Sequence, residues 1–208
     1  FAKIYANEFK NKNISLIVNH KLRQNSSKEA LKVKEILKKK GIESRILTWK
    51  GKIPISNIQA NARKIRYSLI SEYCSRNKIK YLLVAHHMDD QIENFFIRLF
   101  RGSGLTGLSS MPETYDYNKN VKIVRPFLNF KKKELEYITS NYYNTYIKDP
   151  SNEDDKFLRV RIRKYRKNME MEGLDTTKII KTVNDLLTAN KALSFYKNKA
   201  LKNYVSFL

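Results

Sequence analysis

The stretch YLLVAHHMDDQIENFFIRLF (residues 81–100) predicts a buried strand that leads into an amphipathic helix. Its first five residues form a short apolar run, which is typical of a strand in the core of a sheet. Apolar residues then recur at helical spacing, at Ile92, Phe95, Phe96, Leu99 and Phe100. Polar side chains gather at the junction. In open α/β sheets ligands bind at the carboxyl ends of strands, so this junction is a candidate functional site.

The residues before this stretch show the same alternation of strand and helix. Runs of β-branched and other apolar residues at 14–19 and 42–49 predict two more strands, and amphipathic segments at 26–40 and 58–73 predict the helices between them. Ser26 or Ser27 is expected to cap the first of these helices, and Gly41 is expected to end it. This order predicts an α/β fold, with an open parallel sheet covered by helices on both faces and right-handed crossovers.

The character of the chain changes after Gly102. A long loop rich in turn-forming residues is expected first, then a short strand near residue 123, and after it three helical segments, the first two of them basic. We therefore expect two domains: 1–125, an α/β domain, and 126–208, a helical and basic extension. The first nine residues also have the spacing of a helix.

The charge of the chain favours an anionic polymer as partner. Lys and Arg number 42 against 20 Asp and Glu, which gives a formal net charge of +22, and neutralised phosphates release counterions that drive association. A general bias of the organism towards lysine is the alternative explanation. No predicted helix pairs a basic face with a broad exposed apolar one, and the apolar runs are too short to cross a bilayer, so a membrane is not expected as partner.

Cysteine content and the start of the sequence limit the possibilities further. The single thiol, Cys74, forms neither an intramolecular disulfide nor a multi-cysteine metal site. No signal peptide is recognisable in the first residues, so the cytoplasm is the expected compartment.

Three explanations compete for the polar cluster between strand and helix. Asp89 and Asp90 stand where carboxylates cap a helix, but a cap explains only one of them and neither His86 nor His87. A metal site is a second reading, because Asp89 and Glu93 are four residues apart and share a helix face. A functional pocket at the strand end explains the whole cluster and is the reading that we favour.

Five motifs identify a resemblance. They are VNHKLRQNSSKEA, ANARKIRY, AHHMDDQIENFFIRLFRGSGLTGLSSM, VRPFLNFKKKELEYI and DPSNEDDKFLRVRIR. In this order and at similar spacing they resemble the tRNA(Ile)-lysidine synthetases, over roughly residues 14–165 of the chain.

The resemblance implies an N-type ATP pyrophosphatase domain of the adenine nucleotide alpha hydrolase type. Enzymes of this family use ATP, with Mg²⁺, to adenylate the wobble cytidine of an isoleucine tRNA. The amine of free lysine then displaces AMP, and the product is lysidine. Related tRNA thiolation enzymes use paired cysteines or an iron–sulfur cluster, which a chain with one cysteine does not match.

The resemblance also implies roles for individual residues. Arg63, His86 and Asp90 match positions in the adenylation site. Asn19, His20 and Arg23 match residues that border the nucleotide, and Asp89 and Glu93 match residues that organise the pocket or hold Mg²⁺. Arg159, Arg161 and Arg163 match an arginine cluster that faces tRNA or phosphate. For each, a structural role in a solvated helix or in packing remains the alternative, and no metal ligand is assigned.

One departure from the family concerns its phosphate loop. The family's first strand ends in a Ser-Gly-Gly-x-Asp-Ser loop whose N–H groups cradle pyrophosphate, and these 208 residues contain no such loop. We therefore expect a fragment without the first strand. A decayed gene product and a strand supplied by another polypeptide are the open alternatives. The corresponding alternative for function is a catalytically inactive, tRNA-binding part of the enzyme. The sequence does not indicate the oligomeric state.

Overall fold

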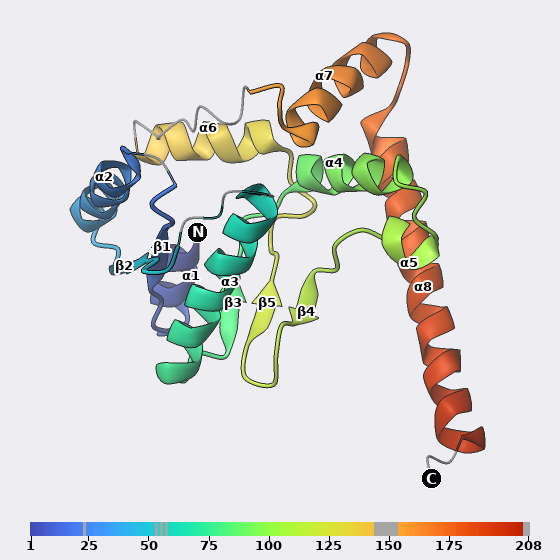
Figure 1. Cartoon of the computed structure of the whole chain (residues 1–208), viewed down its shortest axis with the longest axis horizontal. Helices are drawn as coiled ribbons and strands as arrows, with labels where there is room; N and C mark the ends of the chain where they lie inside the picture. The colour runs from blue at the N-terminus through green and yellow to red at the C-terminus, as the bar shows by residue number, and fades with distance from the viewer. Residues whose placement is uncertain (23, 53, 55, 57, 144–153, 206–208) are drawn as a thin grey trace. The chain divides into compact units, whose positions relative to one another are not determined.

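The computed structural model describes residues 1–22, 24–52, 54, 56, 58–143 and 154–205 (Figure 1). They divide into two compact units. Unit 1 holds Phe1–Leu82 and Tyr117–Val121, and unit 2 holds the described residues of Leu83–Asp116 and from Lys122 onward. Each unit is described by itself. The predicted division at residue 125 into an α/β domain and an extension stays a prediction.

Unit 1 is a βαβ unit followed by a further helix. Its elements are α1 (Ala2–Glu8), β1 (Ser15–Asn19), α2 (Ser26–Lys39), β2 (Ser44–Thr48) and α3 (Ile58–Arg76). Strands β1 and β2 pair in parallel, with register running from Ser15 opposite Ser44 to Asn19 opposite Thr48. A parallel pair needs a crossover between its strands, and α2 provides it. The predicted order of elements is confirmed here.

The core of unit 1 lies between α3 and its two-stranded sheet. Ile70 and Cys74 of α3 are buried together with Val121, and the strand residues that pack against them are Leu16, Val18 and Leu47. Leu16 and Val18 are two positions apart, so they point to the same face of β1. Helix α2 contacts both strands as well. The apolar runs of the strands are therefore explained by helices packed on the sheet.

The two ends of α2 differ in how well the sequence predicts them. Gly41 follows the helix with φ +64°, a conformation that glycine adopts without steric cost, so the predicted end is confirmed. The predicted serine cap is wrong, because the N-cap is Asn25 and it makes no side-chain capping bond. Ser27 lies inside the helix, and its hydroxyl accepts a hydrogen bond from the Asn19 side chain at 3.0 Å.

Unit 2 is mostly helical. Its elements are α4 (Met88–Leu99), α5 (Leu105–Leu108), β4 (Thr114–Asp116), β5 (Lys122–Val124), α6 (Lys132–Tyr143), α7 (Leu158–Met171) and α8 (Thr176–Tyr204). Strand β3 (Tyr81–Leu83), whose last residue is the first of unit 2, joins β5 and β4 in a three-stranded sheet of order β3-β5-β4, in which β4 and β5 are antiparallel. The segment expected as one long loop after Gly102 thus contains α5 and β4, which are too short to show a periodic pattern.

The sheet arrangement also differs in one respect from the predicted one. The described strands form two sheets, β1-β2 and β3-β5-β4, and not one sheet that contains β1, β2 and β3. The difference arises because β3, which is only three residues long, pairs with β5 and not with β1 or β2. The N–H of Val84, the residue after β3, also donates to the carbonyl of Val124 at 3.0 Å. The parallel α/β character and the helical C-terminal region are as predicted.

Three helices build the core of unit 2. The buried residues are Ile92 and Phe96 of α4, Ile162 of α7, and Ile179 and Val183 of α8. The pairs in α4 and α8 are four residues apart, which places them on one helix face. Helix α8 also contacts α5 and runs on beyond it (Figure 1). None of the described helices is long and apolar enough for a membrane span.

Candidate functional site

Helix α4 begins at the polar cluster, as predicted. His87 is the N-cap residue, in extended conformation, and its backbone N–H donates to the Asp90 carboxylate at 3.0 Å. The imidazole nitrogen Nε2 of His87 lies 3.4 Å from the same carboxylate. Asp90 therefore stabilises the first turn of α4, where negative charge complements the helix dipole. His86 precedes the N-cap and is half-buried.

Asp89 connects three helices of unit 2. Its Oδ2 accepts the backbone N–H of Lys132 at the start of α6 at 2.8 Å, and its Oδ1 lies 2.7 Å from Nη2 of Arg166 on α7. Burial by itself raises the pKa of Asp89, but these two partners outweigh it and hold the pKa below its usual value. Asp89 is thus an ionised carboxylate that holds the start of α4 to α6 and α7.

Glu93 lies one turn further along α4 and is 1% exposed. Its two carboxylate oxygens accept bonds from Nε and Nη2 of Arg163 at 2.5 and 3.2 Å. The hydrogen bond to Glu93 raises the pKa of Arg163 further, against the opposing effect of burial. A bidentate arginine–carboxylate pair is a strong and directional contact. The acids of α4 and the arginines of α7 therefore form one ion-pair network, made of Asp89, Glu93, Arg163 and Arg166.

This network includes Asp89 and Glu93, the two carboxylates for which the resemblance implied either organisation of the pocket or binding of Mg²⁺. Both Asp89 and Glu93 are engaged by arginine, and Asp90 is engaged by the backbone of the helix start. Among the described residues, no group of three or more His, Cys, Asp and Glu side chains is arranged to hold a metal ion. A role of Asp89 and Glu93 in organising the pocket matches these contacts better than direct metal ligation.

The other two arginines of α7 have different surroundings. Arg161 is exposed, and its Nη1 donates to the backbone carbonyls of Asp155 and Lys156 at 2.8 and 3.1 Å. Arg159 is half-buried. Among the described residues, Arg163 is the one of these three arginines that bonds an acid of α4, so the three have different surroundings.

The nucleotide-side residues lie in unit 1, at the end of β1. Asn19 is buried, and its Oδ1 accepts the N–H of Lys21 at 3.0 Å. Both ring nitrogens of His20 are buried, and no hydrogen bond to them is found within the described residues. Burial lowers the pKa of His20, and the charge of Arg66 lowers it further. A neutral imidazole with free polar atoms at a strand end fits a ligand-binding role. Arg23 lies outside the described residues.

Arg63 is exposed on α3 in unit 1. Its guanidinium carbon lies 5.0 Å from the centroid of the Tyr67 ring, and that ring stacks on Tyr117 at 5.6 Å. The aromatic face fixes the direction of the arginine by a cation–π contact and leaves its N–H donors accessible. Arg63, Asn19 and His20 thus belong to unit 1, whereas His86, Asp89, Asp90 and Glu93 belong to unit 2.

Two features of unit 2 were missed by sequence reasoning. Arg166 was not singled out, although it lies three residues after Arg163 and therefore on the same face of α7. Gln91 is buried, and its side chain bonds both the N–H and the carbonyl of Met111, at 3.0 and 2.8 Å. The sequence shows only that Gln91 follows Asp89 and Asp90 and precedes the apolar residues of α4. It does not reveal the partner, because Met111 is 20 residues further along the chain.

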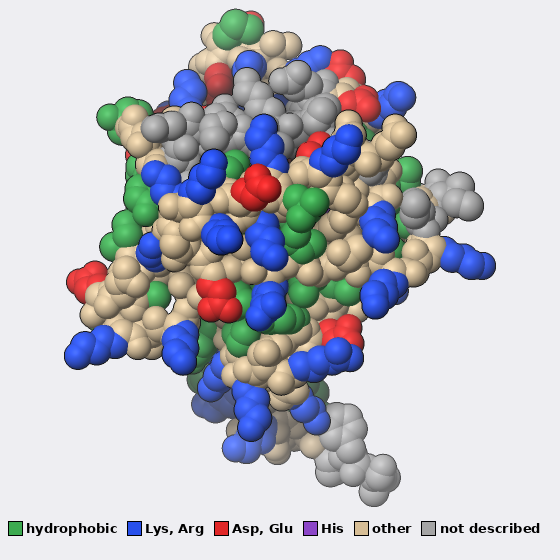
Figure 2. Space-filling model, turned by 90° about the vertical axis from the view of Figure 1, so that its left-hand side faces the viewer, with side chains coloured by type: hydrophobic (Ala, Val, Ile, Leu, Met, Phe, Trp, Pro, Cys, Tyr) green, Lys and Arg blue, Asp and Glu red, His purple; other side chains and the backbone are tan. Residues whose placement is uncertain are grey.

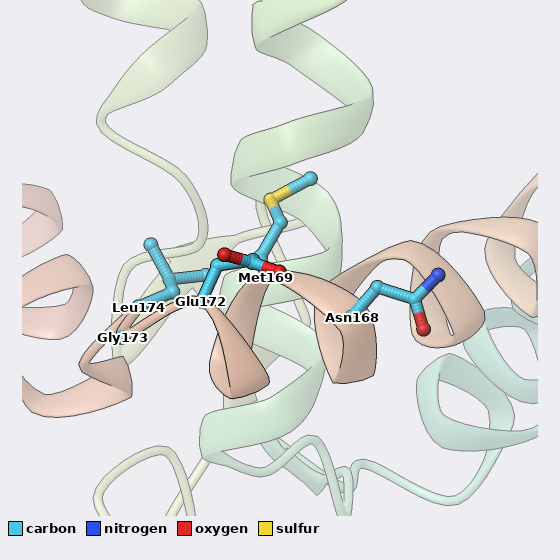
Figure 3. Close-up of a pocket in the computed structure, with 5 residues that line it drawn as sticks. All are labelled: Asn168, Met169, Glu172, Gly173 and Leu174. Atoms are coloured by element: carbon cyan, nitrogen blue, oxygen red, sulfur yellow. The ribbon is translucent and has the colours of Figure 1, made fainter.

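A hollow at the turn between α7 and α8 does not belong to this site. It is lined by Asn168, Met169, Glu172, Gly173 and Leu174 (Figure 3). In Figure 3 the Met169 side chain points away from Asn168, and no cluster of charged groups faces a common centre. This hollow therefore offers no arrangement for phosphate or metal binding.

A family model and curated relatives match this chain. The model described as the PP-loop domain, ATP_bind_3, matches residues 1–168. A tRNA(Ile)-lysidine synthase of Wolbachia pipientis wMel is 42% identical over 93% of this chain and 45% of its own length. One of Orientia tsutsugamushi is 42% identical over 74% of this chain and 34% of its own length. One of a Bradyrhizobium strain is 31% identical over 94% of this chain and 54% of its own length. The chain thus spans about half the length of these relatives or less.

A solved structure shares the fold. The U34-tRNA thiolase NcsA from Methanococcus maripaludis, solved with its 4Fe-4S cluster, has a TM-score of 0.71 over 90% of this chain and 67% of its own. The sequence identity is 17%, so this likeness bears on the fold alone.

Proposed function

The chain belongs to the PP-loop family of ATP-binding domains, and from that premise we propose that it is the ATP-using part of a tRNA(Ile)-lysidine synthase. The proposed reaction joins the amine of free lysine to the wobble cytidine of an AUA-decoding isoleucine tRNA. ATP, accompanied by Mg²⁺, supplies the activation, and AMP and pyrophosphate are released. Such a role belongs in the cytoplasm, where tRNA is found.

One observation carries this proposal, the 42% identity to a lysidine synthase over 93% of the chain. The geometry is compatible with it. The reaction must bind a polyphosphate and a tRNA, and the chain has a net charge of +22. It must also move protons at a base and at an amine; His86 lies between β3 and α4, and Asp90 lies in the first turn of α4, four residues later.

In unit 1 we assign nucleotide binding to Asn19, His20 and Arg63. The buried ring nitrogens of His20, which bond no other described residue, can bond the base or the ribose, and Asn19 fixes the loop after β1 through its bond to Lys21. Arg63 is exposed and its side chain forms no hydrogen bond to another described residue, while Tyr67 holds its direction, which suits a contact with phosphate. Arg23 is assigned to the same nucleotide site from the sequence alone.

In unit 2 we assign proton transfer to His86 and Asp90, and a positioning role to Asp89 and Glu93. Asp89 and Glu93 hold α4 to α7 through Arg166 and Arg163, so they fix where the helix start points. We assign tRNA contact to the arginines at 159, 161 and 163 of α7. Arg161 fits best, since it is exposed and, among the described residues, it bonds backbone carbonyls and no side chain.

The test is the incorporation of labelled lysine into an unmodified isoleucine tRNA transcript, with ATP and Mg²⁺. A transcript with uridine at the wobble position serves as the substrate control. Two variants on α3 form a matched pair, Arg63→Gln and Arg76→Gln, because both residues are exposed arginines of that helix. We expect the unmodified chain to incorporate lysine. Arg63→Gln should lower the incorporation rate at least tenfold, which corresponds to about 1.4 kcal/mol in binding or activation free energy. Arg76→Gln should not lower the rate.

Two other outcomes have a definite meaning. Binding of the transcript without incorporation would favour the alternative, a tRNA-binding part of the enzyme that does not turn over. Equal loss in both arginine variants would show that the charge of α3 matters but that Arg63 has no specific role.

A further inference from the structure

The last part of α8 is exposed along its whole length. Every described residue from Lys191 to Val205 is exposed. Asn190 accepts a hydrogen bond from the Thr106 hydroxyl at 3.1 Å, and within the described residues no later residue of α8 forms a side-chain hydrogen bond to another element. In Figure 1 this part of the helix runs on past α5, its neighbour in the same unit. Packing in unit 2 therefore does not explain the side chains that follow residue 190.

This exposed part of α8 carries positive charge without compensation. It contains Lys191, Lys197, Lys199 and Lys202, and no Asp or Glu occurs after Asp185. None of these lysines forms an ion pair within the described residues. Their spacing places Lys191, Lys199 and Lys202 on one face of the helix, over a length of about 16 Å at ~1.5 Å per residue.

An aromatic side chain lies on the same face. Phe195 is four residues from both Lys191 and Lys199, and it is 63% exposed. Its ring meets that of Tyr196 edge to face, with centroids 5.4 Å apart. Figure 2 shows that lysine and arginine side chains are spread widely over one side of the molecule. On α8, lysine side chains share a helix face with an exposed aromatic ring. Basic side chains around an aromatic platform bind unpaired RNA, because the rings stack on bases while the cations contact phosphates.

We propose that the face of α8 formed by Lys191, Phe195, Lys199 and Lys202 binds an unpaired segment of RNA. Charge complementarity favours RNA over a second copy of the chain, which would bring the same positive charge. A membrane surface fits less well, because Phe195 lies among the lysines and Lys197 interrupts the apolar residues of the opposite side. The identification of that RNA as tRNA rests on the proposed function.

The test measures the binding of an unmodified isoleucine tRNA transcript to the whole chain. Binding is measured by fluorescence anisotropy at several salt concentrations, without ATP or lysine. The first variant replaces Lys191, Lys199 and Lys202 with Gln. Its control replaces Lys28, Lys32 and Lys39 of α2 with Gln, which removes the same charge from another exposed helix face. A second pair compares Phe195→Ala with Leu193→Ala, and circular dichroism checks that α8 stays helical.

We expect the α8 triple variant to lower the slope of log affinity against log salt by about 2, at 0.7–0.9 for each lost phosphate contact. Phe195→Ala should weaken binding roughly fivefold or more, the effect of losing one base stack. The control variants should bind like the unmodified chain. Equal effects of the two triple variants would overturn the proposal, since net charge alone would then explain binding.

Two further outcomes separate this inference from the proposed function. If the chain binds RNA through α8 but forms no lysidine, the inference stands and the enzymatic proposal fails. If lysidine forms normally and the α8 triple variant binds the transcript like the unmodified chain, the inference alone fails. Vesicles of phosphatidylglycerol that bind the chain through the same lysines, in place of RNA, would overturn it as well.

Discussion

The pair between Glu93 and Arg163 gives the sharpest stability prediction. The Glu93 side chain is 2% exposed and that of Arg163 is 32% exposed. Removal of one member of a fully buried pair costs about 3–5 kcal/mol, and the partial exposure of Arg163 reduces this. We expect Arg163→Met to lower the free energy of unfolding by about 2–3 kcal/mol, because Glu93 then stays buried without a cation.

Replacing the acid of this pair should lower the free energy of unfolding less than replacing the arginine. In Glu93→Gln the amide still accepts one hydrogen bond and Arg163 can reach water, so we expect a loss of about 1–2 kcal/mol. Thermal unfolding followed by circular dichroism measures both, and each 1 kcal/mol corresponds to roughly 2–4 °C for a chain of this size. Arg161→Met is the control on the same helix, since Arg161 is exposed and its bonds within the described part of the chain go to backbone carbonyls; it should stay within about 0.5–1 kcal/mol of the unmodified chain.

The pH dependence of Arg163→Met provides an independent check. Without its cation the buried Glu93 acquires a raised pKa, because burial favours the neutral acid. An acid whose pKa is raised on folding destabilises the fold above that pKa, so the deficit of the variant should shrink as the pH falls from 8 to 5. The double variant should cost less than the sum of the two single ones. Additive costs, or single costs under about 0.5 kcal/mol, would refute the assignment of this pair.

Three further predictions concern other contacts of the fold. Asp89→Asn should remove a stabilisation that is fully present above the unfolded pKa of about 3.9 and is lost as the pH falls through the lowered folded pKa; acid titration of both proteins should show that their difference begins to shrink below about pH 4 and vanishes only at more acidic pH. Gln91→Ala should cost about 2–4 kcal/mol in urea unfolding, because both backbone bonds of Met111 lose their partner, and the exposed Gln24→Ala should cost nothing measurable. Gly173→Ala should cost about 1 kcal/mol from backbone strain at φ +92°, since no atom lies within 4 Å of the added methyl group; a neutral effect would contradict this.

The order of strands and helices could be predicted because periodicity is a local property. Apolar side chains recur every second residue in a strand and every third or fourth in a helix, so α2, α3, α4, α7 and α8 are visible in the sequence. Helix α5 and strand β4 could not be found in this way, since three or four residues show no period. The pairing of β3 with β5 was also beyond the sequence, because strand partners are set by packing between distant segments.

The position of the polar cluster at the start of α4 could be predicted for a similar reason. A polar cluster at the junction of strand and helix marks the edge of an α/β sheet wherever the sheet lies. The helix start at Met88 and the stabilising role of Asp90 are local consequences of the residues themselves. The enzymatic roles of His86, Arg63 and the nucleotide-side residues stay predictions.

The sequence by itself determined the order of elements, the end of α2 at Gly41, the excess of positive charge and the family of the chain. Only the tertiary structure decided which cation meets which acid. Glu93 and Arg163 are 70 residues apart, and Asp89 and Lys132 are 43 apart. No periodicity connects such residues, because the packing of α4 against α6 and α7 determines the distances between them. The structure therefore turned a list of acids and arginines into one ion-pair network with defined partners.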